Sequence, residues 1–195
     1  MEIPHLLPSD ERMYELFRER LAPIVEMCSI HKKRLVLRDH SHSDYLTDRA
    51  PGKRLVDALL GRYALRRVVT IRNPIDAWLS MVENGFAAQL AGFEQYCERH
   101  LRFLDDYADV PVWRYKDFVM NPDDVIRALC VELDIPFLAG FAERASGVVL
   151  TDSGRRPRAI TSLPRRAAAA NFLEGAAKLP AYRQISERFN YDGAA

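Results

Sequence analysis

The sequence predicts an α/β fold in three layers, with a mainly parallel sheet flanked by helices. Short aliphatic runs alternate with helical stretches that are too long for hairpin turns. The clearest run is RRVVTI at 66–71, whose β-branched residues suit a strand buried on both faces. The chain has 195 residues, 48% hydrophobic and 28% charged, so we expect a single domain over 1–195 with a real core.

The first half begins with an amphipathic helix over about residues 9–28, bent at Pro23, since apolar residues recur there at helical spacing. KRLVLRD at 33–39 comes next, and its apolar centre predicts a short buried strand. A short helix between Gly52 and Gly61 then leads to the strand at 66–71.

The second half continues the alternation. Asn73 is suited to cap a helix that starts at Pro74 and runs, with an interruption near Gly85, to about residue 107. After it we expect a strand at 110–115, a capped helix over 121–133 and a last helix over 181–189. Residues 145–166 combine five arginines with Gly and Pro, which is typical of a functional or mobile loop.

Charge and cysteine content exclude several classes. Lys plus Arg number 28 against 27 Asp plus Glu, which is too balanced for a protein that coats nucleic acid. Cys28, Cys97 and Cys130 form no C-x-x-C pair, so neither a zinc knuckle nor a disulfide framework is indicated. No signal peptide or apolar run of about 20 residues is found. We therefore expect a cytoplasmic protein without nucleic-acid or membrane partners.

The densest motif is TIRNPIDAWLS at 70–80. Ligands of open parallel sheets lie beyond the carboxyl ends of the strands, where Arg72 precedes a helix start. The Arg72 fork, the helix N-terminus and the Ser80 hydroxyl together predict an anion site. The alternative is that Arg72 pairs with Asp76 and Ser80 faces a neighbouring helix, and residue chemistry alone leaves both open.

RDHSHSDYL at 38–46 also lies just after a predicted strand. His40 there is a candidate general base, with Asp39 or Asp44 to orient it. The alternation of His40, His42 and Asp44 also imitates a metal-binding run, and a third interpretation is a set of polar loop caps.

A third motif, TDSGRRPRAITSLPRR at 151–166, would suit arginines that close over a phosphate, although a solvated basic loop has the same composition. The motifs of ATP-binding P-loops, dinucleotide-binding folds and serine hydrolases do not occur.

The order of several motifs along the chain resembles the PAPS-dependent sulfotransferase family, whose fold is P-loop NTPase-like. These motifs are RDH at 38–40, RNPIDAWLS at 72–80, WRYKDFVMNPDD at 113–124, SGR at 153–155 and RFNYD at 188–192. The resemblance spans most of the chain. It implies that the 3′-phosphate of the donor PAPS is held by Arg72, Ser80, Ser153, Gly154 and Arg155. It also implies that His40 is the base, and that a sulfuryl group moves, without a metal, to a hydroxyl or amine of a small-molecule or glycan acceptor.

The sequence departs from the family pattern at the N-terminus. The family begins with a strand and a glycine-rich loop that hold the 5′-phosphosulfate, whereas the first helix here resembles the helix that comes after that loop. We therefore expect slow or no turnover, retained 3′-phosphate binding, and an exposed sheet edge through which a homodimer forms. The alternatives are a non-catalytic remnant that binds a 3′-phosphonucleotide or a partner and, less favoured, a metal-dependent hydrolase.

Overall fold

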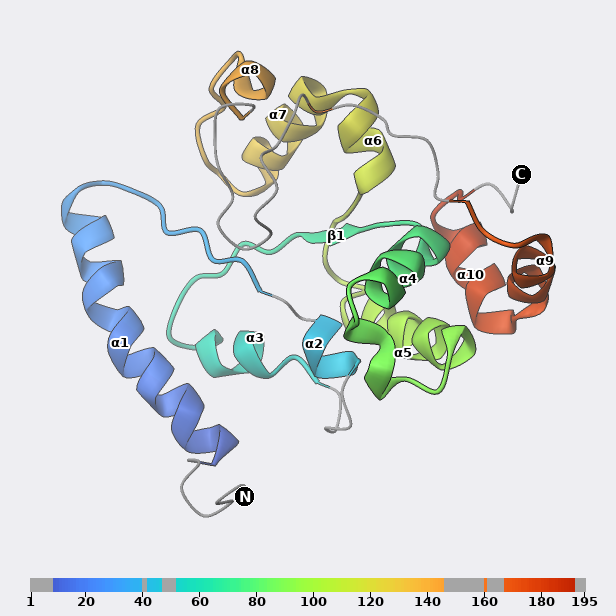
Figure 1. The fold of residues 1–195 in the computed structure, drawn as a ribbon. Helices are drawn as coiled ribbons and strands as arrows, with labels where there is room; N and C mark the ends of the chain where they lie inside the picture. Colours follow the sequence, from blue (N-terminus) through green and yellow to red (C-terminus); the bar gives the residue numbers. More distant parts are fainter. Residues whose placement is uncertain (1–8, 40–41, 47–51, 146–159, 161–166, 192–195) are drawn as a thin grey trace.

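The fold is a mixed α/β arrangement in which helices surround a small sheet (Figure 1). The structure is a computed structural model, and it describes residues 9–39, 42–46, 52–145, 160 and 167–191. The strands are β1 (Val69–Ile71) and β2 (Val112–Arg114). The helices are α1 (Asp10–Ile30), α2 (His42–Tyr45), α3 (Arg54–Leu59), α4 (Pro74–Glu83), the 3₁₀-helix η2 (Phe86–Gln89), α5 (Phe93–Asp106), α6 (Tyr115–Met120), α7 (Pro122–Glu132), α8 (Phe141–Ala145), α9 (Ala170–Lys178) and α10 (Pro180–Arg188).

The two strands pair in parallel, with Val69 opposite Val112 and Ile71 opposite Arg114. A parallel pair needs a long crossover, and α4, η2 and α5 supply it. The α/β class is therefore confirmed at this coarse level. Both strands lie within the ranges predicted at 66–71 and 110–115, and each is shorter than predicted.

The predicted strand over 33–39 is wrong. These residues run as an open, exposed segment after α1, although their sequence is typical of a buried strand. The physical reason is that no strand among the described residues lies alongside to accept their backbone hydrogen bonds. Over the described ranges the sheet has two strands only.

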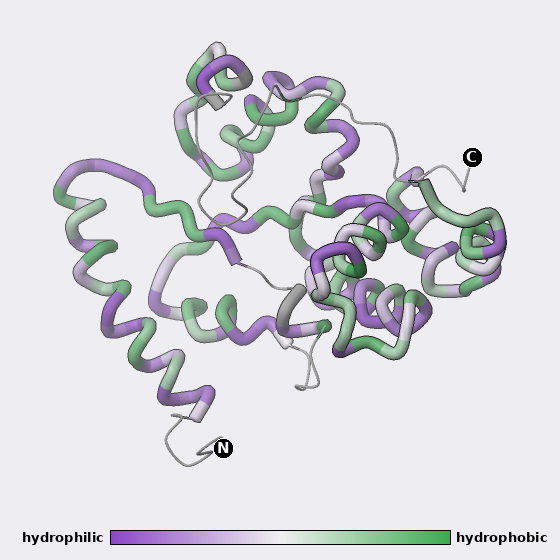
Figure 2. The backbone as a smooth tube through the Cα atoms, in the orientation of Figure 1, coloured by the Kyte–Doolittle hydropathy of each residue, from purple (hydrophilic) through white to green (hydrophobic). Residues whose placement is uncertain are grey.

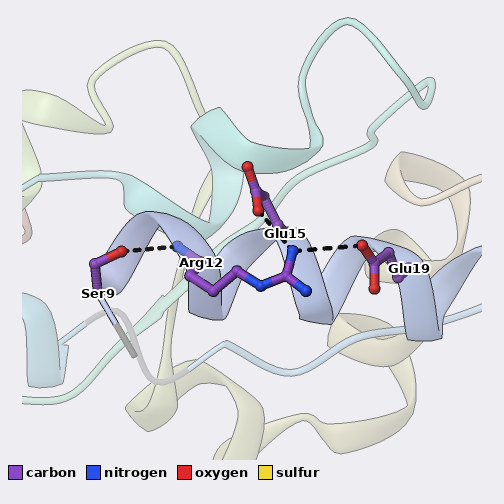
Figure 3. Close-up of polar contacts among 4 residues, drawn as sticks. All are labelled: Ser9, Arg12, Glu15 and Glu19. Atoms are coloured by element: carbon purple, nitrogen blue, oxygen red, sulfur yellow. Dashed lines mark hydrogen bonds and ion pairs between the residues drawn. The ribbon is translucent and has the colours of Figure 1, made fainter. Parts of the chain in front are cut away.

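Capping groups define both ends of α1. At the start, the Ser9 hydroxyl accepts a hydrogen bond from the Arg12 N–H at 3.3 Å, and the Arg12 side chain reaches Glu15 at 2.9 Å and Glu19 at 3.7 Å (Figure 3). At the end, Lys32 adopts a left-handed φ of 52°, and the next N–H, that of Lys33, donates to the carbonyl of Cys28 at 2.8 Å. This left-handed cap stops the helix and redirects the chain into the open segment.

The break predicted near Gly85 is confirmed. Gly85 has φ 75°, a left-handed conformation that glycine adopts without steric cost, and it separates α4 from η2. The long helical stretch is thereby divided, which lets α5 fold back against the sheet.

The core lies where β1, α5 and α10 meet. Its buried members include Ile71 from β1, Tyr96, Cys97 and Leu104 from α5, and Ile185 from α10. This packing fixes the carboxyl end of β1 against two helices. None of the helices in the described part of the chain combines the length and the apolar character that a bilayer span needs.

Candidate anion-binding site

The candidate site lies at the carboxyl edge of the two-stranded sheet. Because the strands are parallel and Ile71 is opposite Arg114, the next residues, Arg72 and Tyr115, leave the sheet at the same edge. A helix begins at once after each strand, α4 after β1 and α6 after β2. The register thus brings together two side chains that are 43 positions apart in sequence (115 minus 72).

Arg72 is half-buried, and the central carbon of its guanidinium lies 5.3 Å from the centre of the Tyr115 ring. Within the described ranges it forms no ion pair, so the predicted alternative of a pair with Asp76 is not what holds it. A guanidinium held over an aromatic face can still use its N–H groups to donate to an anion.

The first turn of α4 adjoins Arg72. Asn73 is 7% exposed, and its side-chain oxygen accepts a hydrogen bond from the Ile75 N–H at 2.9 Å, as predicted for an N-cap. Pro74 occupies the first helical position, so it has no N–H to offer. Asp76 adds a carboxylate to the same turn. Anion binding here therefore depends mainly on the Arg72 side chain and less on the helix terminus.

Ser80 lies farther along α4. It lies six positions after Pro74, which places it about 9 Å along the helix axis from that end. Its hydroxyl accepts a hydrogen bond from the Asn84 amide at 3.5 Å, and its carbonyl accepts a shorter one, 2.6 Å, from the same amide. The structure thus gives Ser80 a partner at the end of its own helix, and no hydrogen bond joins Ser80 to Arg72 in the described part of the chain.

Tyr191 is a site residue that sequence reasoning missed. It is 5% exposed, and its hydroxyl has no hydrogen-bond partner among the described residues. Burial raises the pKa of this phenol, Arg114 lowers it, and Asp117 and Asp76 raise it further, so charged groups from both strand ends act on one hydroxyl. The sequence signal was the RFNYD run at 188–192, which contributed to the resemblance but assigned Tyr191 no role.

A salt bridge fixes the β2 side of the site. Arg114 donates to both carboxylate oxygens of Asp117, at 2.6 and 2.7 Å, and its remaining nitrogen donates to the carbonyl of Phe189 at 2.7 Å. Such a bidentate pair is rigid, and it ties the end of α10 to the sheet. A groove of about 440 Å³ opens beside it, lined by Trp113, Arg114 and Asp117 on one side and by residues 187–190 on the other.

Tyr96 connects the site to the core. It is 3% exposed, and its hydroxyl lies 3.1 Å from Nδ1 of His100. Burial raises its pKa, as do Cys97 and Tyr191, whereas Arg72 lowers it. The positive charge of Arg72 therefore acts on the Tyr96 hydroxyl in the core, as expected for a cation at the boundary between the sheet and α5.

The other predicted site residues lie outside the described residues. These are His40, Ser153, Gly154 and Arg155, and the side chain of His42 is likewise not described. In the ranges that are described, no three His, Cys, Asp or Glu side chains gather as metal ligands would. Because His40 and the His42 side chain fall outside those ranges, the metal alternative at His40, His42 and Asp44 stays a prediction.

The geometry as a whole suits an anionic ligand at the carboxyl edge. One half-buried guanidinium has no carboxylate partner in the described residues, and the buried Tyr191 phenol is affected by charged groups that follow both strands. The chain matches no family model, and neither the curated proteins nor the solved structures contain a match. Function must therefore be argued from the site itself.

Proposed function

We propose that the chain binds the 3′-phosphate of a nucleotide at the carboxyl edge of its sheet, with Arg72 as the principal contact. The observation that carries the proposal is the position of Arg72, which directly follows a parallel strand, precedes a helix and lies over the Tyr115 ring at 5.3 Å from its centre. Nucleotide phosphates bind at such strand ends in open α/β sheets. A planar fork that is already oriented loses little freedom when it meets a phosphate.

The resemblance in sequence extends this proposal to sulfuryl transfer. On that interpretation the chain is a sulfotransferase-family domain in which Arg72, Ser80 and Ser153-Gly154-Arg155 hold PAPS and His40 is the base. The acceptor hydroxyl would attack sulfur as its proton passes to His40, and the bond from sulfur to the bridging phosphate oxygen would break to release adenosine 3′,5′-bisphosphate. The chain's own share is to position the reactants and to neutralise charge.

Thermal unfolding tests the binding step. We expect adenosine 3′,5′-bisphosphate to raise the melting temperature and adenosine 5′-monophosphate to do so much less, because the contact is with the 3′-phosphate. At a ligand concentration 100 times the dissociation constant, the stabilisation should be about 2.7 kcal/mol. Equal shifts with both nucleotides, or none with either, would contradict the proposal.

Arginine variants locate the contact. Arg72→Ala should remove the shift, and Arg72→Lys should weaken binding by about 1.5–3 kcal/mol, because an ammonium cannot reproduce a planar fork. Arg127→Ala is the matched control, since the Arg127 guanidinium also lies over an aromatic ring, that of Phe137, at 4.1 Å. A shift that survives both Arg72 variants would place the phosphate elsewhere.

Turnover separates the two functions that share this binding site. A transferase should convert PAPS to adenosine 3′,5′-bisphosphate in the presence of simple hydroxyl or amine acceptors, and His40→Ala should remove most of that rate without changing nucleotide binding. Binding without turnover would support the alternative of a non-catalytic 3′-phosphonucleotide-binding protein.

A further inference from the structure

The segment 33–39 has an apolar centre that the described structure covers only in part. Leu35, Val36 and Leu37 are 37%, 64% and 45% exposed. Figure 2 shows the apolar centre of this segment between hydrophilic ends, on the open trace that leaves α1. Residues 34–38 form no backbone hydrogen bond with any residue that the structure describes. Unpaired N–H and C=O groups beside apolar side chains are a template for a further strand.

The sequence of this segment is nearly symmetrical about its centre. In KRLVLRD, Val36 is flanked by Leu35 and Leu37, and these by Arg34 and Arg38. A two-fold interface is isologous: if residue i of the first copy contacts residue j of the second, then residue j of the first contacts residue i of the second. Antiparallel pairing about Val36 would therefore place Val36 opposite itself and each Leu35 opposite a Leu37, which gives three apolar cross-strand pairs.

The charges in this register can be accommodated. It sets Arg34 opposite Arg38 of the second copy, which would be unfavourable for two free cations. Arg34, however, already lies 2.7 Å from the carboxylate of Asp134 in its own copy. The outermost pair sets Lys33 opposite Asp39, an attractive pair that the two-fold axis repeats.

Space for a second strand is also present. A groove of about 920 Å³ runs between residues 32–36 and the end of α7, and its walls include Val131, which is 76% exposed, and Pro136. Arg72 does not line this groove, so it is separate from the anion site. The second copy can thus approach the segment without disturbing the proposed nucleotide contact.

We propose that two copies of this chain associate through residues 33–39, which pair as antiparallel strands about a two-fold axis at Val36. The inference is independent of the proposed nucleotide binding, because it uses no residue of that site. A second copy is the occupant that the symmetry of the segment favours over an unrelated peptide.

Sedimentation velocity on the full chain tests the association. From about 1 to about 100 µM, we expect the native protein to shift from monomer towards dimer. Val36→Asp should raise the dissociation constant at least about tenfold, because it sets two carboxylates face to face on the axis. Phe86→Asp is the matched control: Phe86 is 73% exposed and lies outside the segment, so the dimer should persist.

A charge swap tests the register. Val36→Asp and Val36→Lys should each be monomeric alone, whereas an equimolar mixture should form a heterodimer, since the proposed axis sets residue 36 opposite itself. Because the side chain is mostly exposed, both variants should keep the circular dichroism spectrum and melting temperature that the native protein shows at about 1 µM, where it is also monomeric. Loss of the dimer is then not loss of the fold.

Cysteine trapping gives a second readout of the same geometry. In a Cys28→Ser background, Val36→Cys should oxidise rapidly to a covalent dimer, because directly opposed residues have Cα atoms about 4.5–5.5 Å apart, within disulfide reach. Lys33→Cys should not, because its two copies would lie roughly 20 Å apart along the strands. A monomer at every concentration, a dimer that survives Val36→Asp, a mixture that stays monomeric, or equal trapping at 33 and 36 would each overturn the proposal.

Discussion

Arg72 shows how a single side chain can be oriented without a carboxylate. Its guanidinium lies over Tyr115, which is 46% exposed and reaches this position because β1 and β2 end in register. A cation over an aromatic face is held by about 0.5–1 kcal/mol at an exposed site. We therefore treat Tyr115 as a positioning residue for the proposed phosphate contact.

Tyr115 variants test this positioning role. Tyr115→Ala should weaken binding of adenosine 3′,5′-bisphosphate about two- to fivefold by titration calorimetry, the factor that corresponds to about 0.5–1 kcal/mol. Tyr115→Phe should keep the native affinity, because the ring face remains. In an Arg72→Ala background, Tyr115→Ala should have no further effect. An equal loss in the Phe and Ala variants would instead assign the role to the Tyr115 hydroxyl.

Two buried tyrosines should respond in opposite ways to loss of the hydroxyl. The Tyr191 hydroxyl has no partner among the described residues, so Tyr191→Phe should leave the free energy of unfolding unchanged or raise it by up to about 1 kcal/mol. The Tyr45 hydroxyl donates to the Asp106 carboxylate at 2.7 Å, so Tyr45→Phe should cost about 1.5–3 kcal/mol. Urea denaturation measures both. A similar loss in Tyr191→Phe would mean that its hydroxyl has a partner in the native protein.

At the scale of elements, the sequence predicted best where a cap and a periodic pattern coincide. α1 has Ser9 before its apolar repeat, and α4 has Asn73 followed by proline, so both starts were predicted correctly. α9 was not predicted, because Gly175 lies in its interior and Ala169, which precedes it, offers no capping side chain. Helices of four to six residues, such as α2 and α6, are too short to show a period.

The error at 33–39 has a different cause. A strand is stable only when a neighbouring strand accepts its hydrogen bonds, and no local pattern states whether that neighbour exists. The apolar centre of the segment indicates that the segment is suited to burial, but it does not indicate which other segment would cover it. The proposed pairing of two copies is consistent with the pattern as well as with the exposure.

The two N-caps should differ in their effect on stability. Asn73→Ala should cost about 1–2 kcal/mol, because Asn73 is 7% exposed and its removal would leave the Ile75 N–H without its partner in a buried turn. Ser9→Ala should cost about 0.5 kcal/mol, because this cap is exposed and water can replace it. Urea denaturation measures both free energies. Equal losses would show that the α4 cap is not buried in solution.

At the scale of the whole molecule, the sequence predicted the class of the fold and part of the site. It placed Arg72 at a strand end because that inference needs only the next few residues. It could not place Tyr191 near Arg114 and Asp117, because that proximity depends on how α10 returns to the sheet. The number of strands in the sheet likewise could not be predicted from local sequence. The described residues show two of the predicted strands.

The buried core should make the protein sensitive to alkali. Burial raises the pKa of the Cys97 thiol to about 12, and it also raises the pKa of Tyr45, Tyr96 and Tyr191 above the usual value of about 10. The folded state then keeps protons that the unfolded state releases. The resulting stability is complete below the unfolded pKa values and is lost as pH rises above them, by about 1.4 kcal/mol per pH unit for each such group.

Between about pH 8.5 and 10 the thiol is the main group among these four that titrates in the unfolded chain, so its contribution can be isolated. We expect the free energy of unfolding, measured in urea from about pH 7 to about pH 11, to fall first through Cys97 and more steeply once the tyrosines ionise. Cys97→Ala should be less stable at neutral pH, because a side chain with 0% exposure is truncated, yet its stability should fall less between about pH 8.5 and 10. Leu104→Ala, which truncates another α5 side chain with 0% exposure but removes no titratable group, is the control and should keep the native fall over the same range. Parallel profiles for the native and Cys97→Ala proteins would show that the thiol ionises as readily in the folded chain as in the unfolded one, which a fully buried position in this core does not allow.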